Sequence, residues 1–165
     1  MTAVILGTGS RTYDRPDIIR AVLAAVATRY DRDVVLRYGE CRRGADRPMH
    51  QAWKALGLGL QPYPADLSGP CRKDCDHGPR RAYQDGPGDY CPAAGPRRNR
   101  DMIKAGGIDE VHGFPKGSTS GTRITLKLAR AAGLRVYEWT PDSIPQLTAY
   151  VLGTQSGMWP LDGLT

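Results

Sequence analysis

Three cysteines and one histidine lie close together in the middle of the chain. They are Cys71, Cys75, His77 and Cys91. Three thiols and one imidazole are a ligand set of closed structural zinc sites, in which four protein ligands leave no position open for catalysis. The spacing therefore predicts a structural zinc ion. Cys41, in an earlier loop, is an alternative to His77 as the fourth ligand.

A second group of residues has the composition of a phosphate-binding loop. Residues 115–122 read Pro-Lys-Gly-Ser-Thr-Ser-Gly-Thr and separate an apolar segment from an amphipathic one. Such a loop offers an anion backbone N–H groups, hydroxyls and the positive end of a helix dipole. A glycine-containing loop near the N-terminus has similar properties. We expect these two loops to hold phosphate through Gly9, Ser10, Gly117, Ser118, Gly121 and Thr122.

Charged side chains complete this predicted site. Arg11, Arg98 and Lys116 would supply positive charge to the phosphate. Asp46 would accept a hydrogen bond from a ribose hydroxyl. The combination predicts a site for a phosphorylated ligand that also carries a sugar.

The elements that position these residues follow from the hydrophobic pattern. Apolar runs without polar alternation indicate strands that are buried on both faces, and the segments between them have helical spacing. This alternation predicts a Rossmann-like, doubly wound parallel sheet of about five strands with helices on both faces. The predicted strands are 3–6, 33–38, 59–63, 108–114 and 134–139, and the predicted helices are 17–29, 48–56, 99–105, 122–132 and 144–152.

The domain organisation expected from the sequence is simple. The chain has 165 residues, and we expect a single Rossmann domain over 1–140 with an insertion at 64–96 and a C-terminal extension at 141–165. The insertion has no hydrophobic period, so a zinc ion would supply the folding energy that it otherwise lacks. A homodimer is also possible, with Trp139, Met158 and Trp159 offering an apolar contact.

Composition limits the partners. The chain has 23 Lys and Arg against 17 Asp and Glu, a net charge of +6, which suits an anionic partner of unspecified kind or a solvated basic surface. No apolar run approaches the roughly 20 residues that a membrane span requires. Residues 1–6 lack the basic region and cleavage site of a signal peptide, so we expect a cytoplasmic protein whose cysteines bind metal or remain thiols.

Four loops in this order resemble the SLOG superfamily, and within it the small YspA-like proteins of bacteria and phages. The matching segments are 8–13, 43–46, 94–102 and 114–122. The resemblance implies a Rossmann-like fold that binds a nucleotide or a nucleotide-derived, ADP-ribose-like ligand, as a sensor or sequestering protein. It also brings Gly44 and Asn99 into the predicted ligand site.

Two other branches of the superfamily suggest alternatives. Lonely guy phosphoribohydrolases resemble the chain at Arg98–Met102 and Pro115–Thr125, but their catalytic Glu corresponds to Thr125. An N-glycosidic hydrolase acting on nucleoside monophosphates or NAD-like substrates would then have to use Asp46, Glu40 or Asp101 in place of that Glu, with Arg98 as a further candidate.

The second branch contains DNA-processing proteins related to DprA, which bind single strands. It suggests that the insertion binds nucleic acid through its basic and aromatic residues, and we rank this alternative below a nucleotide ligand. These residues are Arg72, Lys73, Arg80, Arg81, Tyr83 and Tyr90.

Overall fold

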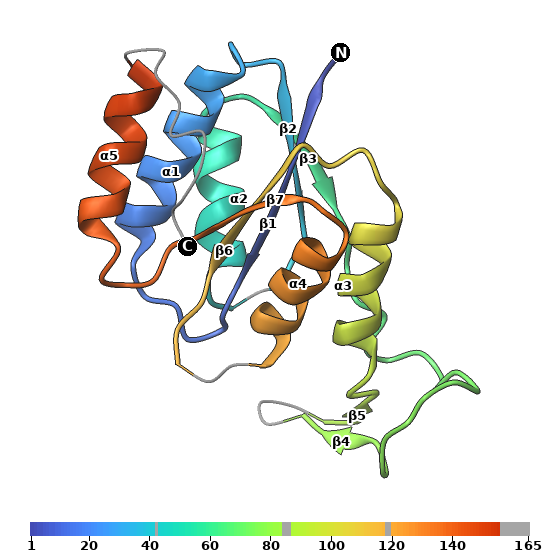
Figure 1. Ribbon diagram of the computed structural model, residues 1–165. Helices are drawn as coiled ribbons and strands as arrows, with labels where there is room; N and C mark the ends of the chain where they lie inside the picture. The colour runs from blue at the N-terminus through green and yellow to red at the C-terminus, as the bar shows by residue number, and fades with distance from the viewer. Residues whose placement is uncertain (42, 84–86, 118–119, 156–165) are drawn as a thin grey trace.

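A computed structural model describes residues 1–41, 43–83, 87–117 and 120–155 (Figure 1). Five helices surround a central sheet, and a small hairpin lies apart from it. The central strands are β1 (Ala3–Gly9), β2 (Val34–Tyr38), β3 (Gly59–Pro62), β6 (Glu110–Phe114) and β7 (Arg135–Glu138), and the hairpin strands are β4 (Arg81–Ala82) and β5 (Asp89–Tyr90). The helices are α1 (Pro16–Arg29), α2 (Asp46–Ala55), α3 (Ala94–Lys104), α4 (Ser120–Ala131) and α5 (Ile144–Gln155).

The central sheet is parallel throughout, with the strand order β3-β2-β1-β6-β7. The chain winds outward from β1 to β3, returns to place β6 on the other side of β1, and continues to β7. Helices α1, α2 and α5 cover one face and α3 and α4 the other (Figure 1). The predicted doubly wound sheet of five strands is therefore confirmed, and its order reverses between β1 and β6.

Strand β1 shows why the sequence folds this way. Ile5 and Leu6 are both fully buried, although neighbouring side chains of a strand point to opposite faces. Ile5 belongs to the cluster that β1 and β2 form with α1, α2 and α5, and Leu6 packs in a second cluster with Met102 of α3 and Leu126 of α4. An apolar run with no polar alternation is what a strand covered on both faces requires.

A buried polar network joins α1 and α5 to the sheet. Glu110 forms an ion pair with Arg29 at 2.8 Å and contacts Nε2 of His112 at 3.0 Å. The indole N–H of Trp139 donates to Nδ1 of His112 at 3.0 Å, so the Nε2 atom of the ring faces Glu110. Arg29 also donates to the hydroxyl of Tyr150 on α5. Trp139 is 1% exposed, so it cannot provide the surface contact expected for a dimer, while Met158 and Trp159 lie outside the described residues.

Several elements differ from the sequence prediction, most clearly α2, α3 and the hairpin of the insertion. Helix α2 begins at Asp46 and not at Pro48, and α3 begins at Ala94 and not at Asn99. In both helices a proline occupies the first turn. Backbone N–H groups of the first turn have no partner within the helix, so a proline there removes no hydrogen bond. The helix can therefore begin before the proline. The hairpin of β4 and β5 was not expected in the insertion.

No described helix is long and apolar enough to cross a membrane.

Candidate functional site

A cavity of about 350 Å³ lies at the carboxyl end of β1, where the strand order reverses. This is the edge at which open α/β sheets bind ligands, and the volume is within the range of small-molecule sites, roughly 300–1,000 Å³. Its walls come from the loops after β1 and β2, the first turns of α3 and α4, and the insertion. The lining residues are Gly7, Thr8, Gly9, Ser10, Arg11, Gly39, Cys41, Asp46, Arg81, Tyr90, Pro92, Gly95, Pro96, Arg98, Asn99, Met102, Gly121 and Thr122.

Two loops of the cavity interlock through glycines. A Cβ on Gly9 would lie 2.2 Å from the Cβ of Ala45, and one on Gly44 would lie 2.2 Å from the carbonyl oxygen of Ser10. Gly44 also has a φ of +70°. The N–H of Ala45 donates to that same Ser10 carbonyl. Gly44 therefore lets the second loop pack on the first and does not itself line the cavity.

Arg98 brings a half-buried positive charge to the cavity. Its Nη1 donates to the carbonyl oxygens of Gly39 and Tyr63, whereas its buried Nε has no hydrogen-bond partner among the described residues. Burial lowers the pKa of Arg98, and the nearby positive charge of Arg11 lowers it further. Binding an anion would therefore stabilise the charged form of this guanidinium.

Asp46 is the carboxylate of the same cavity. It is 6% exposed, and burial raises its pKa to about 6 even though the Cys41 N–H and the charges of Arg98 and Arg11 oppose this shift. The Cys41 N–H donates to its Oδ2 at 2.9 Å. The carboxylate thus holds the loop after β2 and keeps acceptor capacity for a ligand hydroxyl.

The remaining predicted ligand residues divide into two groups. Gly9, Ser10, Asn99, Gly121 and Thr122 line the cavity, the last two at the start of α4, where the helix dipole favours an anion. The others do not line it: Lys116 pairs with Asp14, Gly117 is exposed and accepts a hydrogen bond from Arg123, and Ser118 lies outside the described residues.

Of the catalytic candidates, Arg98 and Asp46 line the same cavity and Glu40 does not. Glu40 is exposed, adopts a φ of +52° and lines a neighbouring cavity of about 410 Å³ with Tyr38 and His50. Asp46 lines both cavities. Thr125 is fully buried and its hydroxyl donates to the carbonyl of Gly121, so it does not replace the missing carboxylate.

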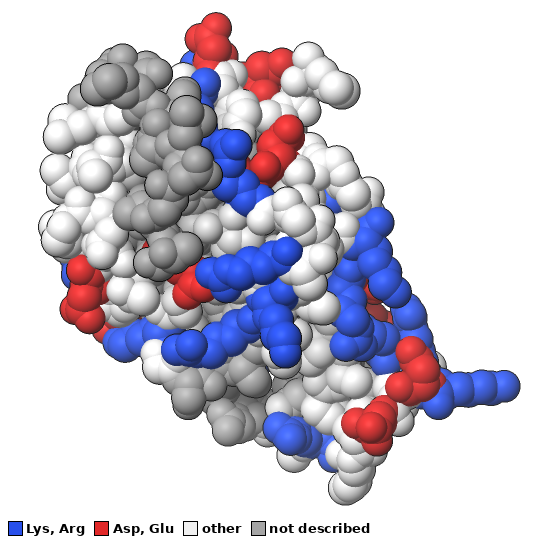
Figure 2. All heavy atoms as spheres, viewed as in Figure 1, with Lys and Arg blue, Asp and Glu red and all other residues white. Residues whose placement is uncertain are grey.

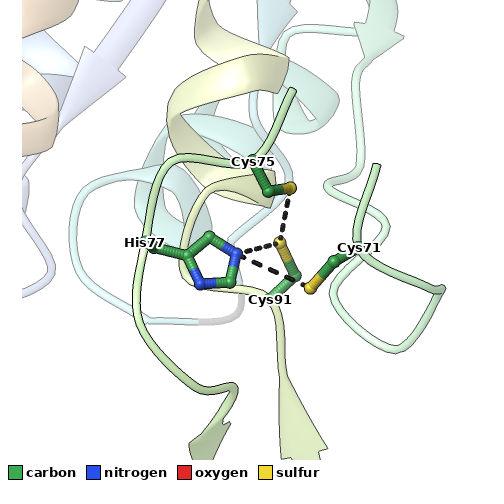
Figure 3. A group of neighbouring side chains, drawn as sticks. All are labelled: Cys71, Cys75, His77 and Cys91. Carbon is green, nitrogen blue, oxygen red and sulfur yellow. Dashed lines mark hydrogen bonds between the residues drawn. The ribbon is translucent and has the colours of Figure 1, made fainter. Parts of the chain in front are cut away.

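The four predicted metal ligands come together in the insertion (Figure 3). Their ligand atoms all lie within 4.8 Å of one another. The Sγ atoms of Cys75 and Cys91 are 3.6 Å apart, and Nε2 of His77 is 3.6 Å from Sγ of Cys71 and 3.3 Å from Sγ of Cys91. A tetrahedral ion with bonds of about 2.3 Å would separate two sulfurs by roughly 3.8 Å. The cluster therefore has the dimensions of a metal site.

The surroundings of the cluster support this interpretation. Nδ1 of His77 donates to the carbonyl of Gly78 at 2.5 Å, which directs the lone pair of Nε2 towards the sulfurs, as in metal-bound histidines. Arg97 lies 2.8 Å from Sγ of Cys75, and Arg80 lies 3.8 Å from Sγ of Cys71. Their positive charges would offset the net negative charge of a divalent ion that is bound by three thiolates. Cys41 lies at the ligand cavity, so the structure selects His77 as the fourth member.

The positive charge of the chain is visible on the face that carries α3 and α4. Figure 2 shows Lys and Arg side chains gathered over these two helices. The cavity itself is lined by Arg11, Arg81 and Arg98 against the single carboxylate of Asp46. The electrostatic balance at the cavity thus favours a multiply charged anion.

Arg81 and Tyr90 were not among the predicted residues of the phosphate site. The sequence placed them in a basic segment suited to nucleic acid, and Tyr90 directly precedes Cys91 of the predicted metal site. What the sequence could not show is that the hairpin lies near the N-terminal end of α3 and brings both residues to the cavity (Figure 1).

No protein-family model matches the chain, and no curated protein matches it either. Among solved structures, the chain is similar to DNA processing protein A (DprA) from Streptococcus pneumoniae, with a TM-score of 0.58 and 17% sequence identity over 94% of this chain. It spans 56% of the length of that protein. At this level of identity the likeness establishes a shared Rossmann-like fold.

Proposed function

We propose that the chain binds a phosphorylated nucleoside in the cavity between β1 and β6. The observation that carries this proposal is the meeting of Arg11, Arg98 and the first turn of α4 with Asp46 at the point where the strand order reverses. The arginines and the helix end suit phosphate, and the carboxylate suits a ribose hydroxyl. Asn99, which is buried in the cavity wall, adds an amide that can read a base or sugar.

Calorimetric titration with AMP, ADP-ribose and inorganic phosphate tests this function. Arg11 is exposed and makes no packing contribution to the core, so Arg11→Ala removes charge without disturbing the fold. We expect it to weaken nucleotide binding about 10-fold or more, because a hydrogen bond to a charged group contributes about 1.5–3 kcal/mol. Arg100→Ala is the matched control, since Arg100 is exposed on α3 and does not line the cavity. Equal weakening by both variants, or no binding at millimolar ligand, would contradict the proposal.

Zinc is the proposed occupant of the Cys/His cluster. Three thiolates and one imidazole whose ligand atoms lie within 4.8 Å of one another suit a thiophilic ion with no open coordination position. Native mass spectrometry should show one zinc ion in the wild-type protein and in Cys41→Ser, and none in Cys91→Ser. Retention of the ion by Cys91→Ser would remove Cys91 from the ligand set.

Hydrolysis of the ligand is the first alternative. Asp46 is the carboxylate that lines the cavity, and a pKa of about 6 would let it exchange a proton near neutral pH. Chromatography of AMP or NAD after long incubation would then reveal free base, and Asp46→Asn would abolish its release. Intact substrate would leave the protein as a binding module.

Single-stranded nucleic acid is the second alternative, favoured by the fold likeness and by the insertion. Arg72, Lys73 and Arg81 are exposed there, and the rings of Tyr83 and Tyr90 lie 5.2 Å apart. Fluorescence anisotropy with a labelled oligonucleotide should then show binding that AMP does not displace and that Tyr83→Ala weakens. Binding that is lost between about 50 and 200 mM salt and is unaffected by Tyr83→Ala would indicate nonspecific charge attraction.

A further inference from the structure

Three pairs of consecutive residues connect the Cys/His cluster to the ligand cavity. In each pair one residue contacts or belongs to the cluster and its neighbour lines the cavity. The pairs are Arg80 and Arg81, Tyr90 and Cys91, and Arg97 and Arg98. The two sites are therefore built on the same short segments of chain.

The hairpin explains two of these pairs. Arg81 and Tyr90 are directly opposite each other in the β4–β5 ladder, so their side chains share one face. Arg80 lies beside this ladder and donates to Asp89 at 2.7 Å and to the carbonyl of Gly69 at 2.7 Å. Through these bonds it joins the segment of Cys71 to the hairpin that carries Arg81 and Tyr90.

The insertion has little else to hold it in place. No described residue among 64–83 and 87–93 belongs to either hydrophobic cluster of the protein. Its links to the remainder are polar, such as the Arg97 contact with Sγ of Cys75, and within the insertion the Cys91 N–H donates to the carbonyl of Leu67. Bonds to a metal would then be the main source of order for the hairpin.

The chemistry of the two hairpin side chains fits opposite ends of a nucleotide. Arg81 adds a guanidinium to a cavity that already holds Arg11 and Arg98, which suits phosphate. Tyr90 presents an aromatic ring that is supported from one side by Tyr83 at 5.2 Å, which suits stacking on a base.

We infer that the metal centre positions Arg81 and Tyr90 as the nucleotide-contacting wall of the cavity, so that nucleotide affinity depends on the bound metal. Arg81 contacts the phosphate and Tyr90 the base. Without the ion, the ligand keeps only the contacts made by the loops of the sheet. This inference rests on the proposed nucleotide-binding function.

Calorimetry with AMP and ribose 5-phosphate tests the inference on zinc-loaded and zinc-stripped protein. Stripping should weaken AMP binding at least tenfold, and added zinc should restore it. Tyr90→Ser, measured with zinc bound, should weaken AMP binding about tenfold but leave ribose 5-phosphate unaffected, because only AMP offers a base for stacking. Arg81→Gln should weaken both ligands. Arg72→Gln should weaken neither, since Arg72 is exposed in the same insertion but does not line the cavity.

The outcomes separate this inference from the function on which it rests. Equal AMP affinity with and without zinc, or in Tyr90→Ser and the wild type, would overturn the inference and leave the nucleotide site standing. If zinc-loaded wild-type protein bound neither AMP nor ribose 5-phosphate, both proposals would be overturned together.

Discussion

Asp46 is the residue at which stability and the proposed ligand binding conflict most directly. Its carboxyl is buried beside two arginines, yet desolvation outweighs their attraction and raises the pKa to about 6. A group whose pKa is higher in the folded than in the unfolded chain destabilises the fold at pH values above both. Such a group is typical of a functional site, because a carboxylate kept only for stability would have its pKa lowered.

Asp46→Asn should therefore stabilise the protein at neutral pH. Between about pH 4, the unfolded value, and about pH 6 the folded state holds more protons, so the free energy of unfolding falls as pH rises. The amide keeps an acceptor for the Cys41 N–H but has no charge to desolvate. Chemical denaturation at pH 7.5 should show a gain on the order of 2 kcal/mol, which shrinks at pH 4.5. A gain of the same size at both pH values would contradict this account.

At the scale of elements, α5 and the insertion are attached by different forces. Helix α5 packs on α1 through Tyr150, which is fully buried and accepts a hydrogen bond from Arg29. Leu147 and Val151 of the same helix pack against the larger hydrophobic cluster. The insertion, in contrast, depends on the Cys/His cluster and on polar links. The segment after residue 140 thus contributes to the core, whereas the insertion does not.

Tyr150→Ala tests the attachment of α5. The substitution leaves a cavity among Tyr137, Trp139 and Arg29, whose contacts with Tyr150 are lost. We expect the free energy of unfolding to fall by about 3–5 kcal/mol, as for other large aromatic truncations in cores. Gln146→Ala, at an exposed position of the same helix, should change it by less than about 0.5 kcal/mol. Similar effects of the two substitutions in urea denaturation would show that α5 is not docked as described.

At the scale of the whole molecule, stability should separate into two parts. Both hydrophobic clusters lie between the sheet and its helices, and the insertion with its Cys/His cluster lies beside the end of α3 (Figure 1). Removing the metal should therefore release the insertion without unfolding the domain.

Limited trypsin digestion with and without a zinc chelator tests this separation. Arg72 and Lys73 are exposed in the insertion, and cleavage there requires a segment that can adapt to the protease. We expect rapid cleavage after chelation and slow cleavage with zinc. The main thermal transition should move by less than about 4 °C, the shift that about 1 kcal/mol produces in a domain of this size. A fall well beyond that would show that the metal also supports the core.

Much of this protein could be derived from its sequence because the signals are local. Apolar runs such as 3–6 and helical spacing such as 17–29 predicted the doubly wound sheet, since burial on both faces leaves no polar alternation in a strand. Cys71, Cys75 and His77 predicted a metal cluster through their close spacing, and Arg98 and Asp46, which were predicted to share a ligand site, line one cavity.

Only the tertiary structure decided which distant residues meet. In the structure Lys116 pairs with Asp14, and Gly44 packs against the first loop. Trp139 is buried in the core, and the fourth member of the cluster is His77 and not Cys41. It also brought Arg81 and Tyr90 to the cavity. The physical reason is that such contacts join segments far apart in the chain, where pairing depends on how sheet, helices and insertion pack and not on the residue types within a single segment.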